Sequence, residues 1–205
     1  ATFNQGVKVF DGTKVDHNFV STFATLPRKA KVWDVDTALF GDPSRSIPSM
    51  ASVSHYTGWF YSKQAKGDLV DFEKKTMSPE LRNRVQQYID RAKLEPINPA
   101  VEQFGKDELL CREKIDANLP RVIFGHDLAY NLVLRMYFGD LLNEIIRHNS
   151  TTCAAMGVDP NSTDWRSVYE RSHVFDNMIL GDISKHEAGT NECFKDGFVK
   201  YVQCK

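Results

Sequence analysis

The 205-residue sequence lacks the signatures of several large protein classes. No run of apolar residues approaches the roughly 18 that a membrane-spanning helix requires, so we expect no membrane span. There is no GxxxxGKS/T phosphate loop, no GxGxxG, no HExxH, no GxSxG and no paired CxxC. The chain therefore gives no support to P-loop or dinucleotide-binding enzymes, zincin proteases or α/β-hydrolases, and we expect no cofactor.

An excess of positive charge is also missing. Lys and Arg number 26 against 27 Asp and Glu, which gives a formal net charge of −1. Proteins that hold nucleic acid on a broad basic face are usually far more positive. This balance argues against bulk electrostatic binding of DNA, RNA or an anionic membrane, and it leaves a local basic groove open.

Cysteine is scarce and scattered. The four cysteines are too far apart in the sequence to suggest a metal cluster: Cys111, Cys153, Cys193 and Cys204. Their even number permits two disulfides or four free thiols. A chain of this length has little need of disulfides, so we favour free thiols. That state favours an intracellular or virion location over a secreted one, but the sequence leaves the compartment open.

Helical periodicity dominates the arrangement of apolar residues. The clearest start signal is Ser78-Pro79-Glu80, which offers a hydroxyl cap, a proline at the first helical position and an acid in the first turn. A shorter helix is expected over residues 98–105. Residues 122–148 are apolar around most of a helical circumference, which predicts one or two buried helices at the centre of the molecule.

The N-terminus carries the one clear hairpin signal. Residues 7–15 alternate in polarity across an Asp-Gly pair, and we place them in a hairpin or arm over residues 1–16. No repeat, low-complexity tract or linker indicates a second domain. The expected fold is therefore a single all-α domain over residues 1–205, with roughly seven to nine helices and a small N-terminal β-hairpin.

A polar stripe crosses the apolar central segment. Asp127, Asn131 and Arg135 recur every four residues, so on a helix they share one slowly drifting face. The stripe fits a solvent-facing edge of a largely buried helix. It also fits a buried polar network in which Arg135 pairs with an acid such as Asp127 or Asp140, because an unpaired buried charge is strongly disfavoured. An active site is the third interpretation.

The adjacent His126-Asp127 pair resembles the His-Asp metal ligands of all-α metal-dependent phosphohydrolases. Imidazole and carboxylate groups hold divalent metals, which activate water for attack on phosphate. Such a site needs a further histidine upstream, where His55 and His17 are available, and an aspartate downstream, where Asp182 is the candidate. An ordinary histidine near the start of a core helix is the competing interpretation.

Two groups of basic residues contain aromatic residues or stand beside them. The members of the first group are Arg28, Lys29 and Lys31, next to Trp33, and those of the second are Arg82, Arg84 and Arg91, around Tyr88. Arginine and aromatic side chains together can hold single-stranded nucleic acid through phosphate pairing and base stacking. The alternative is that these cations are solvated on the polar faces of their helices.

The absence of any catalytic motif favours a non-enzymatic structural subunit of a larger assembly, such as a viral coat, nucleocapsid or other virion component. Its partners would be further copies of itself or neighbouring subunits, with nucleic acid held through the local basic patches. The alternative function is a metal-dependent phosphohydrolase that uses His126 and Asp127. A nucleic-acid-binding module without assembly is the third class.

Overall fold

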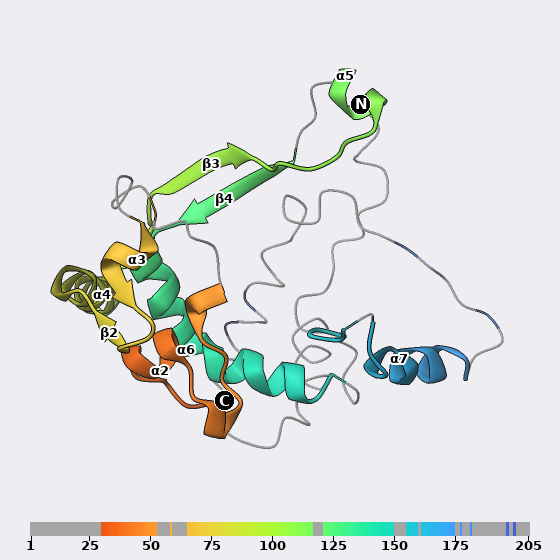
Figure 1. Cartoon of the computed structure of the whole chain (residues 1–205), viewed down its shortest axis with the longest axis horizontal. Helices are drawn as coiled ribbons and strands as arrows, with labels where there is room; N and C mark the ends of the chain where they lie inside the picture. The colour runs from red at the N-terminus through yellow and green to blue at the C-terminus, as the bar shows by residue number, and fades with distance from the viewer. Residues whose placement is uncertain are drawn as a thin grey trace. The chain divides into compact units, whose positions relative to one another are not determined.

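The computed structural model (Figure 1) describes residues 30–52, 58, 65–116, 121–149, 155–159, 161–174, 177, 181, 196 and 199. The hairpin expected within residues 1–16 lies outside these residues. The chain divides into two compact units, one over Lys31–Asp140 and one that combines Ala1–Ala30 with Leu141–Lys205. Most of the described elements belong to the first unit, and the candidate site lies within it.

Two of the helices are longer than all the other elements, and short helices and strands lie before, between and after them. Their order along the chain is α2 (Val35–Phe40), the 3-10 turns η1 (Pro43–Arg45) and η2 (Met50–Ser52), α3 (Lys66–Leu69), β1 (Val70–Asp71), β2 (Thr76–Met77), α4 (Pro79–Ala92), β3 (Val101–Gly105), α5 (Arg112–Asp116), β4 (Val122–His126), α6 (Leu128–Arg147) and α7 (Asp164–Ser172). Within the described residues, no helix has the length and apolar character that a membrane crossing requires.

The helix predicted after Ser78 is α4. The Ser78 side chain accepts a hydrogen bond from the backbone N–H of Leu81, which satisfies one of the donors that a helix start leaves unpaired. Leu81, Val85 and Tyr88 recur at helical spacing and are buried. Local signals thus determine both where this helix begins and which of its faces packs into the core.

The all-α prediction is wrong, because the described chain also forms two antiparallel two-stranded sheets, β1–β2 and β3–β4. Residues 101–105, expected to be helical, form β3, and residues 122–126, expected to open a central helix, form β4. Each strand is only five residues long, and periodicity cannot separate so short a run from helix. The pairing of β3 with β4 decides the outcome (Figure 1).

The core of the first unit forms around α6. Leu128, Ala129 and Leu132 are at most 3% exposed, and they belong to one apolar cluster with the buried face of α4 and with Trp33. The Trp33 ring lies against Gly139 so closely that a β-carbon there would come within 2.4 Å of it. Glycine at position 139 therefore lets the indole ring pack directly on the α6 backbone.

Candidate nucleic-acid interface

Asp127 stands immediately before α6 and joins this helix to α4. Its side chain is buried, and it accepts hydrogen bonds from the backbone N–H of Ala129 at 2.6 Å and from the Tyr88 hydroxyl at 3.0 Å. The Arg84 guanidinium lies 3.5 Å from the same carboxylate. Burial, together with the Asp127 carboxylate, raises the pKa of Tyr88 above its usual value of 10.0.

Gly58 makes the close approach at Asp127 possible. It adopts φ +99°, and a β-carbon at this position would lie 2.5 Å from the Asp127 α-carbon. A residue with a side chain would be strained by the backbone conformation and would also collide with Asp127. The Asp127 backbone thus lies directly against Gly58, while its carboxylate contacts Tyr88 and Arg84 of α4.

Asp140 is a second buried carboxylate, 1% exposed, near the middle of α6. It accepts a hydrogen bond from the Trp33 indole N–H at 3.2 Å and one from the backbone N–H of Lys31 at 2.8 Å. The Arg45 guanidinium completes the group at 3.8 Å. The Asp140 carboxylate accepts hydrogen bonds from residues more than 100 positions earlier in the sequence. It therefore connects α6 to the segment that precedes α2.

Arg135 pairs with a different group from the one expected. Its guanidinium donates to the backbone carbonyl of Pro48 and lies 5.9 Å from the centre of the Trp33 ring. Asn131 donates to the carbonyl of His126 at 3.4 Å. The polar residues of the stripe thus lie on α6 or immediately before it, but they contact different parts of the first unit.

His126, at the end of β4, contacts an aromatic ring. Its imidazole centre lies 5.4 Å from the Tyr130 ring centre. No group of three or more histidine, cysteine or acidic side chains suited to a metal ion occurs among the residues that the structure describes. Asp127, the other proposed ligand, already accepts hydrogen bonds from α4 and α6, as described above.

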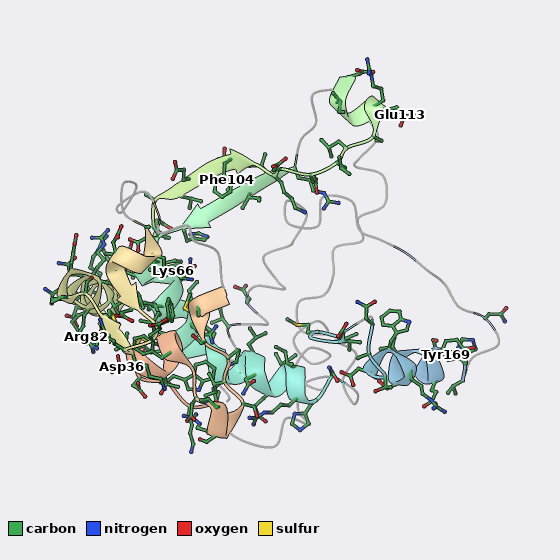
Figure 2. All side chains as sticks on the ribbon, viewed as in Figure 1. Asp36, Lys66, Arg82, Phe104, Glu113 and Tyr169 are labelled. Carbon is green, nitrogen blue, oxygen red and sulfur yellow. The ribbon has the colours of Figure 1, made fainter. Side chains whose placement is uncertain are left out.

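The cations on α4, and Lys93 just after its end, are each matched by a carboxylate. The pairs are Arg82 with Asp36 at 2.9 Å, Arg84 with Asp127 at 3.5 Å, Arg91 with Glu95 at 2.9 Å and Lys93 with Asp90 at 2.9 Å. Figure 2 marks Arg82 and Asp36, the pair that connects α4 to α2. In the other basic group, Lys31 is exposed, whereas Arg28 and Lys29 lie outside the described residues.

A pocket of about 280 Å³ opens beside α4. The residues that line it are Arg84, Gln87, Tyr88, Asp90 and Arg91. The Arg84 guanidinium lies 4.9 Å from the Tyr88 ring centre, in a cation–π contact at the edge of this pocket. Two of the arginines predicted to contact nucleic acid therefore share one concave surface.

The β3–β4 ribbon presents aromatic and cationic side chains together. Phe104 pairs with Ile123 across the strands, so these two side chains share one face of the ribbon. The backbone N–H of Lys106 donates to the carbonyl of Arg121 at 2.8 Å, which continues the ladder by one pair. Because side chains alternate along a strand, Lys106 and Arg121 fall on the face of Phe104 and Ile123.

Two cations on this face share one carboxylate. Glu108 lies 3.0 Å from the Lys106 ammonium and 3.3 Å from the Arg121 guanidinium. The Phe104 side chain, marked in Figure 2, is 40% exposed. We call this group the ribbon site: Phe104, Lys106, Glu108 and Arg121.

Sequence reasoning missed the ribbon site because it assigned residues 98–105 to a helix. A usable signal was present, since Val101 to Gly105 and Val122 to His126 are two short runs with a Phe-Gly step in each. The segment between the two runs is much longer than the roughly 3–5 residues of an ordinary hairpin loop, so the signal for their pairing was weak. The residues that flank this segment were the candidates to consider.

Comparison with known proteins identifies the family. The family model described as "Viral RNA-dependent RNA polymerase" matches residues 14–200. The RNA1 polyprotein of Grapevine fanleaf virus is 32% identical over 96 residues, which are 46% of this chain and 4% of the polyprotein. The solved Sicinivirus 3Dpol RNA-dependent RNA polymerase superposes with a TM-score of 0.67 at 20% identity, over 80% of this chain and 33% of that one.

These findings overturn the functions predicted from the sequence. A structural subunit such as a viral coat or nucleocapsid is wrong, and so is the phosphohydrolase alternative, because the similarity to polymerases extends over nearly the whole chain. The mixed arrangement of helices and strands likewise agrees with a polymerase fold and not with an all-α one. The chain spans only a third of the solved polymerase that it matches. It belongs to the viral RNA-dependent RNA polymerase family.

Proposed function

We propose that this chain is part of a viral RNA-dependent RNA polymerase and that its ribbon site binds RNA. The family match over residues 14–200 is the observation that carries the proposal. A polymerase copies templates of any sequence, so its RNA contacts must tolerate every base. Contacts to phosphates and to the faces of bases meet this requirement, because every nucleotide presents both.

The ribbon site offers both kinds of contact. The exposed Phe104 ring provides a surface on which a base stacks, and such stacking contributes about 1–3 kcal/mol per base. Lys106 and Arg121 provide two cations for the phosphate backbone on the same face. With one carboxylate between two cations, the pair keeps a surplus positive charge in a chain whose net charge is −1.

Helix α4 is a second candidate contact. Arg84 and Arg91 line the pocket beside this helix, and their position supports the RNA-binding role that the sequence predicted for them. Each α4 cation has its own carboxylate, however, so this face holds less surplus charge than the ribbon site. The ribbon is therefore the primary proposal.

Affinity for single-stranded RNA of mixed sequence, measured by fluorescence anisotropy at several salt concentrations, tests the proposal. Arg121→Gln should weaken binding several-fold and reduce the slope of log K against log salt by roughly 0.7, the value for one phosphate contact on a single strand. Arg166→Gln is the matched control, because Arg166 is also an exposed arginine in one ion pair and belongs to neither basic group. Equal losses in both variants would contradict a specific role for the ribbon.

Self-association remains a prediction. The sequence suggested contacts with further copies of the chain or with neighbouring subunits, and light scattering at increasing protein concentration measures the mass directly. A mass that rises above 23.4 kDa would support self-association. The RNA titrations should be carried out below the concentration at which this occurs, so that the two equilibria stay separate.

A further inference from the structure

The β3–β4 ribbon joins the rest of the first unit at one end. Strand β3 is exposed throughout, and β4 becomes half-buried only at Gly125 and His126. Val101 pairs with His126 at this end, and the ladder runs from there toward Arg121 in the ribbon site. At a rise of roughly 3.4 Å per residue, the ribbon site is about 17 Å from the attached end.

A single residue, Asp127, separates the end of β4 from the start of α6. Each residue has two rotatable backbone torsions, so a change at this point turns the ribbon relative to the helix. At about 17 Å, a rotation of roughly 10° displaces the ribbon site by about 3 Å. A displacement of this size exceeds the distance range within which a hydrogen bond forms. Contacts at the attached end therefore decide where the ribbon site lies.

Tyr130, in the first turn of α6, makes ring contacts at this end. Its ring centre lies 5.4 Å from that of the His126 imidazole and 5.6 Å from that of Tyr88 on α4. The two tyrosine rings meet at 61°, in the edge-to-face arrangement that aromatic pairs prefer. Because this preference has a direction, the rings restrain the angle between β4 and α4 as well as their distance. The other contact is the hydrogen bond from Asn131 to the His126 carbonyl, which is long at 3.4 Å.

We propose that Tyr130 is a positioning residue that holds the ribbon at a fixed angle to α4, so that one RNA strand contacts both. The proposal rests on the proposed RNA-binding function. Tyr88 also lines the pocket beside α4, so its ring connects the two candidate RNA contacts. A strand held at one surface reaches the second intramolecularly, which strengthens binding only if their separation is fixed. In this role Tyr130 acts through His126 and Tyr88 and needs no contact with the RNA.

The angle of the ribbon is measured first, without RNA. Spin labels on noncanonical amino acids at Gln103 of β3 and Asn83 of α4, both exposed, report the distance between the two elements by pulsed electron paramagnetic resonance. We expect a narrow distribution of distances in the unchanged chain and a broader or shifted one in Tyr130→Leu. Tyr130→Phe keeps both ring contacts and should keep the narrow distribution. Tyr137→Leu is the matched control, because Tyr137 is a 43% exposed tyrosine on the same helix.

RNA affinity is measured second, by fluorescence anisotropy with strands of two lengths. Tyr130→Leu should weaken binding of a strand of about 16 nucleotides several-fold, because the strand spans both surfaces. A strand of about 4 nucleotides occupies one surface only, so its affinity should change little. Circular dichroism confirms that each variant is folded. If Tyr130→Leu does not fold, His126→Ala removes the opposite ring of one contact and provides the same comparison.

Three results would overturn the proposal. The first is a distribution of distances that is the same in folded Tyr130→Leu as in the unchanged chain. The second is an equal broadening in Tyr137→Leu, because the loss of any tyrosine from α6 would then have the same effect. The third is an equal loss of affinity for long and short RNA. If the unchanged chain binds no RNA, the proposed function fails, and the spin-label distances still decide whether Tyr130 holds the ribbon.

Discussion

Two regions of the molecule place acidic groups next to aromatic or cationic ones. The first consists of the buried carboxylates Asp127 and Asp140, and the second is the ribbon site. The two regions differ in how exposed these groups are and in how many donors each carboxylate has. Asp127 and Asp140 are at most 5% exposed, and each collects several donors from its own chain. In the ribbon site one carboxylate serves two cations whose side chains are largely exposed. The comparison separates polar groups that stabilise the fold from polar groups that are available to a ligand.

The difference follows from the cost of leaving a buried charge unsatisfied. A buried carboxylate must keep its donors in every functional state, because losing one carries a desolvation penalty. An exposed cation exchanges one anion for another, or for water, at little cost. The following variants test this contrast, beginning with the largest expected effect.

Trp33→Ala should destabilise the protein by about 3–5 kcal/mol. The Trp33 side chain is only 4% exposed, it packs on Gly139, and its loss removes one donor from Asp140. Urea unfolding followed by circular dichroism measures the change. The neighbouring Val32 is 59% exposed, and Val32→Ala should change stability by less than about 0.5 kcal/mol. Similar values for the two variants would contradict the assignment of Trp33 to the core.

Asp127→Asn should cost about 1–3 kcal/mol of stability and leave the RNA affinity of the folded protein unchanged. The variant retains the side-chain volume but removes the negative charge of the carboxylate. That carboxylate accepts the hydrogen bond from Tyr88 and forms the ion pair with Arg84. Asp36→Asn, which weakens only an exposed ion pair, is its control. A large loss of RNA affinity in a folded Asp127→Asn protein would place this carboxylate in a binding site.

Phe104→Ala should weaken RNA binding by roughly 5- to 150-fold, as expected for the loss of one base-stacking contact. Stability should change little, because the ring is 40% exposed. Phe124 is 54% exposed on the opposite face of the same ribbon, since it pairs with Gln103. Phe124→Ala should therefore have a smaller effect on RNA binding. The reverse order would assign the RNA contact to the other face.

The smallest effect concerns the pH dependence contributed by Tyr88. Its pKa is raised in the folded protein, so the hydrogen bond to Asp127 contributes fully below the unfolded pKa of about 10, and this stability is lost as the pH rises through the folded pKa. The difference in urea midpoint between the unchanged chain and Tyr88→Phe should shrink as the pH rises above about 10. A difference in urea midpoint that does not change with pH would contradict a stabilising hydrogen bond between Tyr88 and Asp127.

Part of the proposed binding surface was predictable from the sequence, but the ribbon site was not. The basic face of α4 follows from helical spacing, so Arg84 and Arg91 were identified as neighbours. Phe104 and Arg121 are far apart in the sequence and meet only because β3 pairs with β4. Their proximity depends on strand register, which no local pattern in a short apolar run specifies.

The sequence by itself determined α4, from the Ser78 cap to the buried stripe through Tyr88, because helix signals act between residues within one or two turns. It also placed Asp127 and Arg135 on or beside one apolar helix. Only the tertiary structure decided that residues 101–105 and 122–126 are strands, and that Asp140 meets Trp33. The physical reason is that strand pairing and buried hydrogen bonds join residues whose separation in the sequence leaves no periodic trace.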